Sequence, residues 1–360
     1  MKIGIVGGGI FGLLAAKKIK DNLKNNVDIT IFEFNDNILK GASANNLNRI
    51  HLGYHYPRSK KTAYQSKLNY YKFIDIFEKC IRDDIKSYYF IAKKNSKVNF
   101  SQYVNFCNKI KLPFKEVNLE KIDFKVNNIL GGIETNEAVY DIDKIRNVFI
   151  KFCKKNSILL SLKNKVTQIY SYEKKVDIKS DNFNETFDFV LDTSHIYTNS
   201  FKTNLKNNLI NKRYQKTLVL NVKIDLSSNI GAAVMDGNFV SFLPNGFKDN
   251  HLLYDVENSV IFEKNSLTFN PYSDSDSEID IEKINSKIFK KFNFFFPDTS
   301  INEVKSSNFS YRLLPVSKVD ERVSKLQKFS DNFLSVSSTK VDHSIELSDK
   351  IYEHIKNNFL

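Results

Sequence analysis

A glycine-rich turn near the start of the chain constrains its fold more than any other feature. Five of the chain's 12 glycines lie within the first twelve residues, where a G-x-G-x-x-G pattern begins at Gly7. The pattern stands between an apolar run over 3–6, typical of a buried parallel strand, and apolar residues at helical spacing over 13–23. A second strand over 27–34 completes a βαβ unit. The sequence therefore predicts an α/β fold that begins with a parallel sheet.

The residues of this turn suit a bound pyrophosphate. Gly7 permits a tight turn, Gly9 lets the backbone approach the phosphates, and Gly12 allows the helix to pack closely on the strand. Ile10 and Phe11 lie in the turn directly before the helix, whose free N–H groups and positive dipole attract anions. The turn therefore predicts a dinucleotide site.

An acidic residue at the end of the second strand narrows the choice of dinucleotide. Glu33 can accept the hydroxyls of an adenosine ribose, and its carboxylate would repel a 2′-phosphate. The sequence contains no second G-x-G-x-x-G pattern, which a two-nucleotide reductase or an NADPH monooxygenase would normally carry. These residues leave NAD or FAD as the candidate cofactors.

The positive net charge does not point to nucleic acid. The chain has 54 basic and 41 acidic residues, but the basic set consists of 47 Lys and only 7 Arg, spread along the whole length. Nucleic-acid binders usually concentrate Arg and cluster their charge, so the excess of +13 is better explained by a coding bias. With 41% hydrophobic residues over 360 positions, we expect one large or two medium domains.

Cysteine usage excludes several classes of site. Cys80, Cys107 and Cys153 are widely spaced and form no C-x-x-C pair, so we expect no disulfide framework, no metal site and no dithiol centre. The apolar stretch Ile3–Ala16 is too short and too rich in glycine to span a bilayer. We expect a cytoplasmic protein with no signal peptide and no integral membrane segment.

The rest of the chain alternates between helical and strand patterns. Apolar spacing predicts helices over 61–81, 101–110, 141–155, 281–289 and 341–355. Strands are predicted over 87–92, 165–172, 176–179 and 187–192, with further strand-like alternation over 216–269. The first of these helices is predicted to carry Leu68, Tyr71, Phe73, Ile76 and Phe77, and Ser277 with Asp280 predicts a cap for the helix at 281. No linker rich in Pro or Gly separates two halves, so two domains would be interleaved.

The segment after Glu33 carries a family resemblance. It reads Lys40-Gly-Ala-Ser-Ala-Asn-Asn-Leu-Asn-Arg-Ile-His-Leu-Gly-Tyr-His-Tyr-Pro57. This resembles the D-amino-acid oxidase/glycine oxidase superfamily of FAD-dependent oxidoreductases, and its second half is similar to the L-2-hydroxyglutarate dehydrogenase branch. It also looks like uncharacterised FAD oxidoreductases associated with surface-polysaccharide genes. The resemblance implies FAD as the cofactor, with Ala42, Ser43 and Asn46 along the pyrophosphate and flavin.

Later landmarks resemble the same superfamily in the same order. Glu137–Asp141 resembles the return into the FAD domain, Val166 begins the strand that would contact adenine, and Thr193 ends an apolar strand beside the adenosine. Two positions depart from the family pattern. Ser194-His195 replaces a glycine turn, and Ser337-Ser338-Thr339-Lys340 replaces a glycine-rich flavin segment before a helix that the serines could cap. Lys340 could place positive charge near the flavin pyrimidine ring.

The resemblance implies an α/β fold in which a Rossmann-type FAD domain is interleaved with a substrate domain of mixed and antiparallel sheet plus helices. By this resemblance the FAD domain covers 1–80, 141–204 and 323–360, and the substrate domain covers 81–140 and 205–322.

Four side chains are candidates for chemistry on a substrate. His51 could accept a hydroxyl proton because an imidazole titrates near neutral pH, and His55 lies nearby in the same loop. Arg312, in an Arg-x-x-Pro landmark of the substrate domain, could clamp a carboxylate, or Arg49 could do so instead.

These features predict an FAD-dependent dehydrogenase or oxidase that removes hydride from a carbon next to a hydroxyl or amine. The substrate would be a small, anionic hydroxy acid, amino acid or sugar derivative, and electrons would leave to oxygen or a carrier. Two alternatives remain open. His51-x-Gly53-x-His55 also resembles a segment of UDP-galactopyranose mutase, a non-redox flavoenzyme on a nucleotide sugar, and the two altered turns would suit a flavin-free binding protein.

Overall fold

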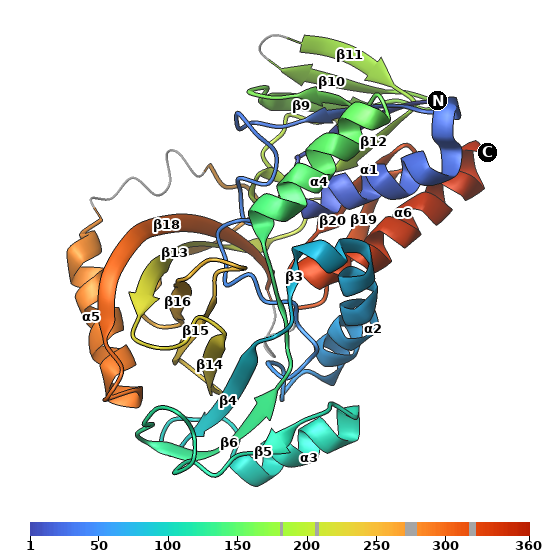
Figure 1. The fold of residues 1–360 in the computed structure, drawn as a ribbon. Coiled ribbons are helices and arrows are strands. Elements are labelled where there is room, and N and C mark those ends of the chain that lie inside the picture. Colours follow the sequence, from blue (N-terminus) through green and yellow to red (C-terminus); the bar gives the residue numbers. More distant parts are fainter. Residues whose placement is uncertain (181–182, 206–208, 271–278, 317–321) are drawn as a thin grey trace.

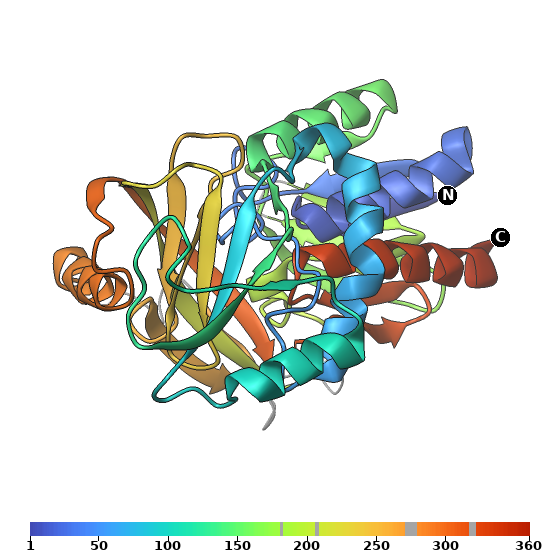
Figure 2. The same cartoon turned by 60° about the horizontal axis from the view of Figure 1, so that its bottom comes forward.

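Two β-sheets organise the molecule (Figure 1). The computed structural model describes residues 1–180, 183–205, 209–270, 279–316 and 322–360. Figure 2 shows the helix α2 between the second sheet and the helices α1 and α6 of the first. This arrangement is the mixed α/β fold that the sequence predicted.

The first sheet has six strands in the order β19-β20-β12-β1-β2-β8. All neighbours pair in parallel except β19 with β20. Both faces of the sheet are covered, which is why β1 and β12 are almost entirely apolar and buried. Its strands are β1 (Lys2–Val6), β2 (Asp28–Phe32), β8 (Leu159–Ser161), β12 (Phe189–Asp192), β19 (Lys325–Ser330) and β20 (Phe333–Ser337).

Helices cover one face of this sheet and a small antiparallel sheet covers the other (Figure 1). The small sheet contains β9 (Val166–Ser171), β10 (Val176–Ser180) and β11 (Phe183–Phe187). The helices of the chain are α1 (Ile10–Leu23), α2 (Lys60–Phe77), α3 (Phe100–Ile110), α4 (Ile142–Lys155), α5 (Ile281–Phe295) and α6 (Ser344–Phe359). Short 3₁₀ turns are η1 (Lys24–Asn26), η2 (Glu78–Cys80), η3 (His195–Tyr197) and η5 (Val341–His343).

The second sheet has nine strands in the order β17-β13-β16-β15-β14-β4-β6-β5, with β18 also paired to β13. All of its pairs are antiparallel except β14 with β4, and α5 packs against one face. Its strands are β4 (Lys86–Ala92), β5 (Lys115–Glu116), β6 (Ile129–Thr135), β13 (Lys212–Ile224), β14 (Ile230–Met235), β15 (Val240–Pro244), β16 (His251–Asp255), β17 (Val260–Ser266) and β18 (Ile301–Pro315). The strands β3 (Ile81–Arg82) and β7 (Val139–Tyr140) form a separate pair beside Arg49, which bridges to Val139.

The helix predicted over 61–81 is α2, which begins at Lys60 and ends at Phe77. Of the apolar residues that it carries, Leu68, Tyr71 and Ile76 are exposed. The buried face instead carries Ala63, Ser66, Tyr70, Phe73 and Phe77, which recur at three- and four-residue spacing. The apolar residues of this helix therefore occupy more than one face, and only that one packs on the core.

Three other boundaries differ from the sequence-based expectation. The predicted strand at 187–192 is divided, because Phe187 ends β11 and β12 begins only at Phe189. The helix predicted over 281–289 continues to Phe295. Asp280 caps that helix by accepting from the backbone of Lys283, whereas Ser277 lies outside the described residues.

Candidate functional site

One cavity of about 1040 Å³ receives residues from both sheets. The ends of β1, β2 and β12 form one part of its wall, and β13, β16 and β18 form another. It lies at the carboxyl ends of the parallel strands, where α/β sheets usually bind their ligands. Of the residues predicted for the site, all but Gly12 line the cavity: Gly7, Gly9, Ile10, Phe11, Glu33, Ala42, Ser43, Asn46, Arg49, His51, His55, Val166, Thr193, Arg312, Ser338, Thr339 and Lys340.

Each glycine of the turn is explained by a different physical feature of its position. Gly7 adopts φ +106°, and a Cβ there would lie 2.7 Å from the carbonyl oxygen of Thr193. A Cβ on Gly12 would lie 2.3 Å from the carbonyl oxygen of Gly7, so Gly12 is required by packing and not by a ligand. Gly9 is the N-cap of α1 and has no side-chain cap, and a Cβ there would meet only Ser43 Oγ at 3.4 Å. The uncapped end of α1 is therefore open to the cavity at Gly9.

Glu33 lies buried at the end of β2 and already accepts three hydrogen bonds. Its Oε2 accepts from the backbone N–H of Gly8 at 2.8 Å, and its Oε1 accepts from the backbone and side-chain N–H groups of Asn35 at 2.8 and 2.6 Å. A carboxylate has about four acceptor positions. Glu33 therefore has room for about one further donor, and not for both ribose hydroxyls as the sequence suggested.

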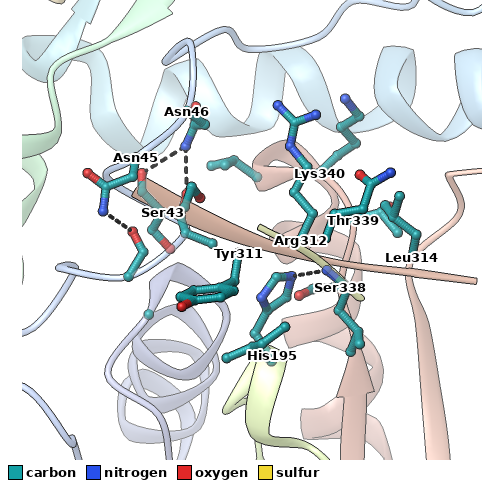
Figure 3. A pocket seen from close by; sticks show the side chains of 18 of the residues that line it. Ser43, Asn45, Asn46, His195, Tyr311, Arg312, Leu314, Ser338, Thr339 and Lys340 are labelled. Carbon is teal, nitrogen blue, oxygen red and sulfur yellow. Dashed lines mark hydrogen bonds between the residues drawn. The ribbon is translucent and has the colours of Figure 1, made fainter. Parts of the chain in front are cut away.

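The segment over 42–46 is held by Asn46 and Tyr140. The side-chain amide of Asn46 donates to the carbonyl oxygens of Ala42 and Ser43 at 2.9 and 3.1 Å, and its Oδ1 accepts from the backbone of Asn48. Tyr140 donates to the Ser43 carbonyl at 2.9 Å, while Ser43 Oγ accepts from the backbone N–H at the start of α1. Figure 3 shows Ser43, Asn45 and Asn46 with these local hydrogen bonds. Asn46 thus orders the wall of the cavity.

The turn after β12 contains Ser194 and His195 where the family resemblance led us to expect a glycine. The hydroxyl of Thr193 contacts the carbonyl oxygens of Val6 and Gly7 at 3.0 and 2.9 Å, which ties this strand to the glycine turn. His195 occupies the left-handed region at φ +56°, and its Nε2 accepts from the backbone N–H of Leu313 at 3.4 Å (Figure 3). Burial lowers the pKa of His195 to about 4, so the neutral ring can accept that bond at pH 7. His195 links the two parts of the cavity wall.

Arg49 is held by a buried carboxylate and a buried phenol. Its Nη1 donates to the hydroxyl of Tyr89 at 2.7 Å, and its Nε lies 3.5 Å from Glu137 Oε2. Glu137 also accepts from the backbone N–H of Leu52 at 2.7 Å and from Tyr89. Arg49 Nε and Nη2 have no hydrogen-bond partner. The guanidinium is therefore oriented by protein groups, and two of its nitrogens are buried without a hydrogen-bond partner.

An imidazole and an amine meet beside this arginine. Lys340 Nζ lies 3.2 Å from His51 Nε2, and Nδ1 of His51 has no hydrogen-bond partner. Nδ1 of His55 lies 3.3 Å from Arg49 Nη1. Burial and the charge of Lys340 lower the pKa of His51, and burial and the charge of Arg49 lower the pKa of His55, in both cases well below the ordinary value. Both imidazoles are neutral at pH 7.

The cavity collects most of the chain's few arginines. Five of the seven line it: Arg49, Arg58, Arg213, Arg312 and Arg322. Arg312 Nη1 donates to the hydroxyl of Tyr254 at 2.7 Å, and Arg58 is paired with Asp236. In a chain with 47 lysines, this placement of planar multi-donor groups favours an anionic ligand.

The predicted serine cap before the C-terminal helix is wrong. The 3₁₀ turn η5 begins at Val341 with Lys340 at its N-cap, and neither this turn nor α6 has a side-chain cap. Thr339 is instead fixed through its backbone N–H, which donates to Ser324 Oγ at 2.9 Å, and Ser324 in turn contacts His343 Nδ1 at 3.0 Å. The turn over 338–340 is therefore shaped by a neighbouring loop, and it brings Lys340 to the cavity.

Several wall residues had no assigned role in the sequence analysis. Tyr56 lines the cavity, and its hydroxyl is buried without a hydrogen-bond partner. On the wall, Tyr254 anchors Arg312 and Asp236 pairs with Arg58, while the fully buried Tyr89 anchors Arg49 from behind the wall. Tyr56 stood within the quoted motif, but the others face the site only through tertiary structure.

The residues present fit a dinucleotide. The N-terminus of α1 at Gly9, which has no side-chain cap, suits a pyrophosphate, and Glu33 has room for a ribose hydroxyl. A volume of about 1040 Å³ is at the upper end of the range of about 300–1,000 Å³ for ligand sites, which suits a large cofactor together with a substrate.

Solved structures share this architecture over nearly the whole chain. Glycine oxidase from Geobacillus kaustophilus superposes with a TM-score of 0.75 at 11% identity, covering 99% of this chain and 93% of that one. L-alpha-glycerophosphate oxidase from Mycoplasma pneumoniae, solved with FAD bound, gives 0.76 at 13% identity, covering 99% and 94%. The chain has the fold of the D-amino-acid oxidase/glycine oxidase superfamily. L-proline dehydrogenase from P. horikoshii has this fold too, with a TM-score of 0.72 at 11% identity and coverage of 99% and 93%.

The curated proteins that resemble the chain in sequence are named monooxygenases, not oxidases or dehydrogenases. No family model matches the chain. The chain is 27% identical over 192 residues to the FAD-dependent monooxygenase FPY4 of Fusarium mangiferae, covering 53% of this chain and 49% of the relative. It is 26% identical over 258 residues to the FAD-dependent monooxygenase kojA of Aspergillus flavus, covering 68% and 58%. The chain thus spans about half the length of the curated relatives it matches.

The described residues were expected to contain neither a membrane segment nor a metal site. None of the described helices is long and apolar enough to cross a bilayer. Within the same residues, no group of three or more His, Cys, Asp or Glu side chains is placed to hold a metal ion.

Proposed function

We propose that the chain is an FAD-dependent oxidoreductase that oxidises a carbon–hydrogen bond next to a hydroxyl or amine in a small anionic substrate. The observation that carries this proposal is one continuous cavity with the glycine turn in one part of its wall and arginines and imidazoles in another. The fold supports it, because the oxidases and the dehydrogenase named above share that fold. The names of the curated relatives support FAD as the cofactor.

FAD would lie along the wall that the glycine turn begins. The pyrophosphate would face the N-terminus of α1 at Gly9, and the adenosine would lie between Glu33 and Val166. When bound, FAD supplies the acceptor for two electrons. We propose these residues as its binding site: Gly7, Gly9, Ile10, Phe11, Gly12 (through packing), Glu33, Ala42, Ser43, Asn46, Arg49, Val166, Thr193, Ser338, Thr339 and Lys340.

The protein groups around the substrate would bind its anion and take its proton. Arg312, anchored by Tyr254, presents a guanidinium that can hold a carboxylate with two parallel hydrogen bonds. His51 is neutral at pH 7 because burial lowers its pKa, and its Nδ1 faces no protein partner. His51 is therefore the candidate acceptor for the hydroxyl or amine proton, and His55 stays a second candidate beside Arg49.

The two sheets suggest how the chain divides. Strands of the first sheet fall within 1–80, 141–204 and 323–360, and strands of the nine-stranded sheet fall within 81–140 and 205–322. We assign the first set of segments to the FAD domain and the second to the substrate domain. We also propose that oxygen or an electron carrier accepts the electrons that the substrate gives up.

Anaerobic mixing tests the function directly. Freshly purified protein should show flavin absorbance near ~450 nm, or take up added FAD. Candidate hydroxy acids, amino acids and acidic sugar derivatives are then mixed with the loaded protein without oxygen. Loss of the flavin band with formation of the keto or imino product supports the proposal. An isomerised sugar nucleotide without net bleaching would support a mutase instead, and failure to bind FAD would support a flavin-free binding protein.

A second candidate activity is monooxygenation, because both curated relatives are named FAD-dependent monooxygenases. The discriminating measurement is the fate of oxygen. A monooxygenase places one atom of ¹⁸O₂ in the product and needs an external reductant such as NADPH. An oxidase or dehydrogenase bleaches its flavin with the organic substrate alone.

A further inference from the structure

The helix α2 has a second apolar face, which points away from the core. On that face, Tyr64, Leu68 and Tyr71 are 47, 71 and 56% exposed. The opposite face packs on the core through residues that include Tyr70 and Phe73. In Figure 2, α2 lies at the front of the molecule, beside the second sheet. Because soluble proteins usually cover large apolar side chains that gather on one helix face, this face has the composition of a contact surface.

The exposed residues of α2 have the spacing of a contact between two helices. Lys61, Tyr64, Leu68, Tyr71 and Asp75 are all exposed, and they follow one another at intervals of three, four, three and four residues. Positions with this spacing form a single stripe along a helix, into which the side chains of a second helix can pack. We call these five residues the outer seam of α2.

The charges of the outer seam lie at its two ends, with the apolar residues between them. Lys61 and Asp75 are each seven residues from Leu68. If a second α2 packs antiparallel with a two-fold axis at Leu68, Lys61 of each copy therefore lies opposite Asp75 of the other. Tyr64 and Lys72 are each four residues from Leu68, so the same axis places an aromatic ring opposite an amine. The seam is therefore complementary in charge to an antiparallel copy of itself.

Other occupants fit the outer seam less well. Exposed lysines flank it at Lys60 and Lys72, which would suit an anionic bilayer, but Asp75 within the seam would be repelled there. A parallel second helix would place Lys61 beside Lys61 and Asp75 beside Asp75. An antiparallel copy uses the base and the acid together, as a two-fold interface requires of a surface that contacts itself.

We infer that the outer seam of α2 binds the outer seam of a second copy of this chain, antiparallel and with Leu68 at the two-fold axis. The contact joins two helices of 18 residues, which belongs to the small interfaces of less than about 1,200 Å². The dimer is therefore one that forms and dissociates with concentration.

The mass of the full chain in solution tests this inference. Sedimentation is measured from about 1 to about 100 μM, with and without added FAD, and the wild-type mass should rise from monomer to dimer over this range. Leu68→Glu places two carboxylates at the axis and should weaken the dimer by about tenfold or more. Leu159→Glu is the matched control, since Leu159 is 58% exposed on β8, and it should change nothing. A wild-type chain that stays monomeric, or a dimer that Leu68→Glu leaves intact, would overturn the inference.

Charge reversal tests the antiparallel register. Each dimer contains the Lys61–Asp75 pair twice, so Lys61→Glu and Asp75→Lys should each weaken it by about three- to tenfold. The double variant restores opposite charges and should return the dissociation constant to within about threefold of wild type. Two weakened single variants without recovery in the double variant would contradict the register.

A cross-linking experiment covers the case in which a charged variant does not fold. The native cysteines Cys80, Cys107 and Cys153 are buried, so Leu68→Cys adds one exposed thiol. A short bifunctional maleimide should join two Leu68→Cys chains much faster than two Leu159→Cys chains, and equal rates would count against the contact. Monomeric protein that binds vesicles of phosphatidylglycerol, and loses that binding in Leu68→Glu, would assign the seam to a bilayer and overturn the inference.

Discussion

The amine of Lys340 lies 3.2 Å from Nε2 of His51, across 289 positions of sequence. The part of each side chain that is exposed lines the cavity, and protein surrounds the rest. Because His51 is neutral, the proton on its ring must sit on one of two nitrogens. A charged lysine can only donate, so it places that proton on Nδ1, whereas a neutral lysine can also accept from Nε2–H, which leaves Nδ1 free as an acceptor. The charged form of Lys340 therefore excludes the tautomer of His51 in which Nδ1 is the acceptor, and the neutral form permits it.

This relationship gives a pH dependence with a definite sign. Burial and neighbouring arginines lower the pKa of Lys340 to about 7, while the buried carboxyl of Asp342, whose own pKa burial raises, opposes this shift. The acceptor form of His51 Nδ1 therefore increases as the pH rises and Lys340 loses its proton. We expect the rate of flavin reduction to rise about tenfold per pH unit below about pH 7 and to level off above it, as for a single ionisation. Anaerobic rapid mixing at a series of pH values measures this rate.

The matched variant for that profile is Lys340→Met, which keeps an unbranched side chain one heavy atom shorter and removes the titrating amine. Its rate should lose the step near pH 7, and the NMR-detected pKa of His51 should increase because the charge of Lys340 contributes to lowering it. An unchanged step in Lys340→Met, or a rate that falls as the pH rises, would remove Lys340 from control of His51.

Two glycines of the same turn should respond in opposite ways to alanine. At Gly9, φ is −79° and a Cβ would meet only Ser43 Oγ at 3.4 Å, so Gly9→Ala should fold normally. Its methyl group would nevertheless occupy the path of a pyrophosphate, and we expect FAD binding to weaken by at least tenfold. At Gly12, a Cβ would lie 2.3 Å from a backbone oxygen, so Gly12→Ala should destabilise the fold by about 1–3 kcal/mol or more.

Urea unfolding and FAD titration together check this pair. The expected result is a normal unfolding midpoint with weak FAD binding for Gly9→Ala, and a lowered midpoint for Gly12→Ala. Normal FAD affinity in Gly9→Ala would place the pyrophosphate elsewhere.

The buried carboxylate beside Arg49 gives a stability prediction. Glu137 accepts from Leu52 and Tyr89 and offsets the charge of Arg49, so Glu137→Ala leaves a buried cation and a buried N–H without their partner. Removing one partner of a buried pair costs about 3–5 kcal/mol. Glu137→Gln keeps an acceptor for Leu52 and should cost less. Chemical denaturation of both variants measures the difference, and equal stability of wild type and Glu137→Ala would contradict this role.

The local parts of the site could be predicted from sequence, because their determinants lie within a few turns of one another. The glycine pattern, the following helix and Glu33 all belong to one βαβ unit, and each lies where the pattern indicates. The hydrogen bonds of Glu33 to Gly8 and Asn35 could not be predicted, since they depend on side-chain geometry and reduce its capacity for a ribose. The pattern identified Glu33, but it did not show how many hydrogen-bond acceptor positions Glu33 has left for a ligand.

Contacts between distant segments could not be predicted from the sequence pattern, because they too depend on tertiary structure. Arg49 and Glu137 are joined only because the loop after β2 meets β7, and nothing in either local sequence signals the other. Leu68 and Tyr71 of α2 are exposed, which shows a second limit of the sequence pattern. Apolar residues at helical spacing predict a helix, but they do not show which of its faces the neighbouring elements cover. Burial is decided by tertiary packing.

The left-handed backbone at His195 gives a prediction about stability. His195 holds φ +56°, where a residue with a Cβ is strained, but its ring accepts the N–H of Leu313. Relieving the backbone gains about 1 kcal/mol for glycine relative to alanine, and the lost hydrogen bond costs about 0.5–1.5 kcal/mol. We therefore expect His195→Gly to leave the unfolding free energy nearly unchanged and His195→Ala to lower it by about 0.5–1.5 kcal/mol, since alanine keeps the strain and lacks the acceptor. Denaturation of both variants gives the comparison, and an alanine variant as stable as the glycine variant would show that the turn changes its conformation when the histidine is removed.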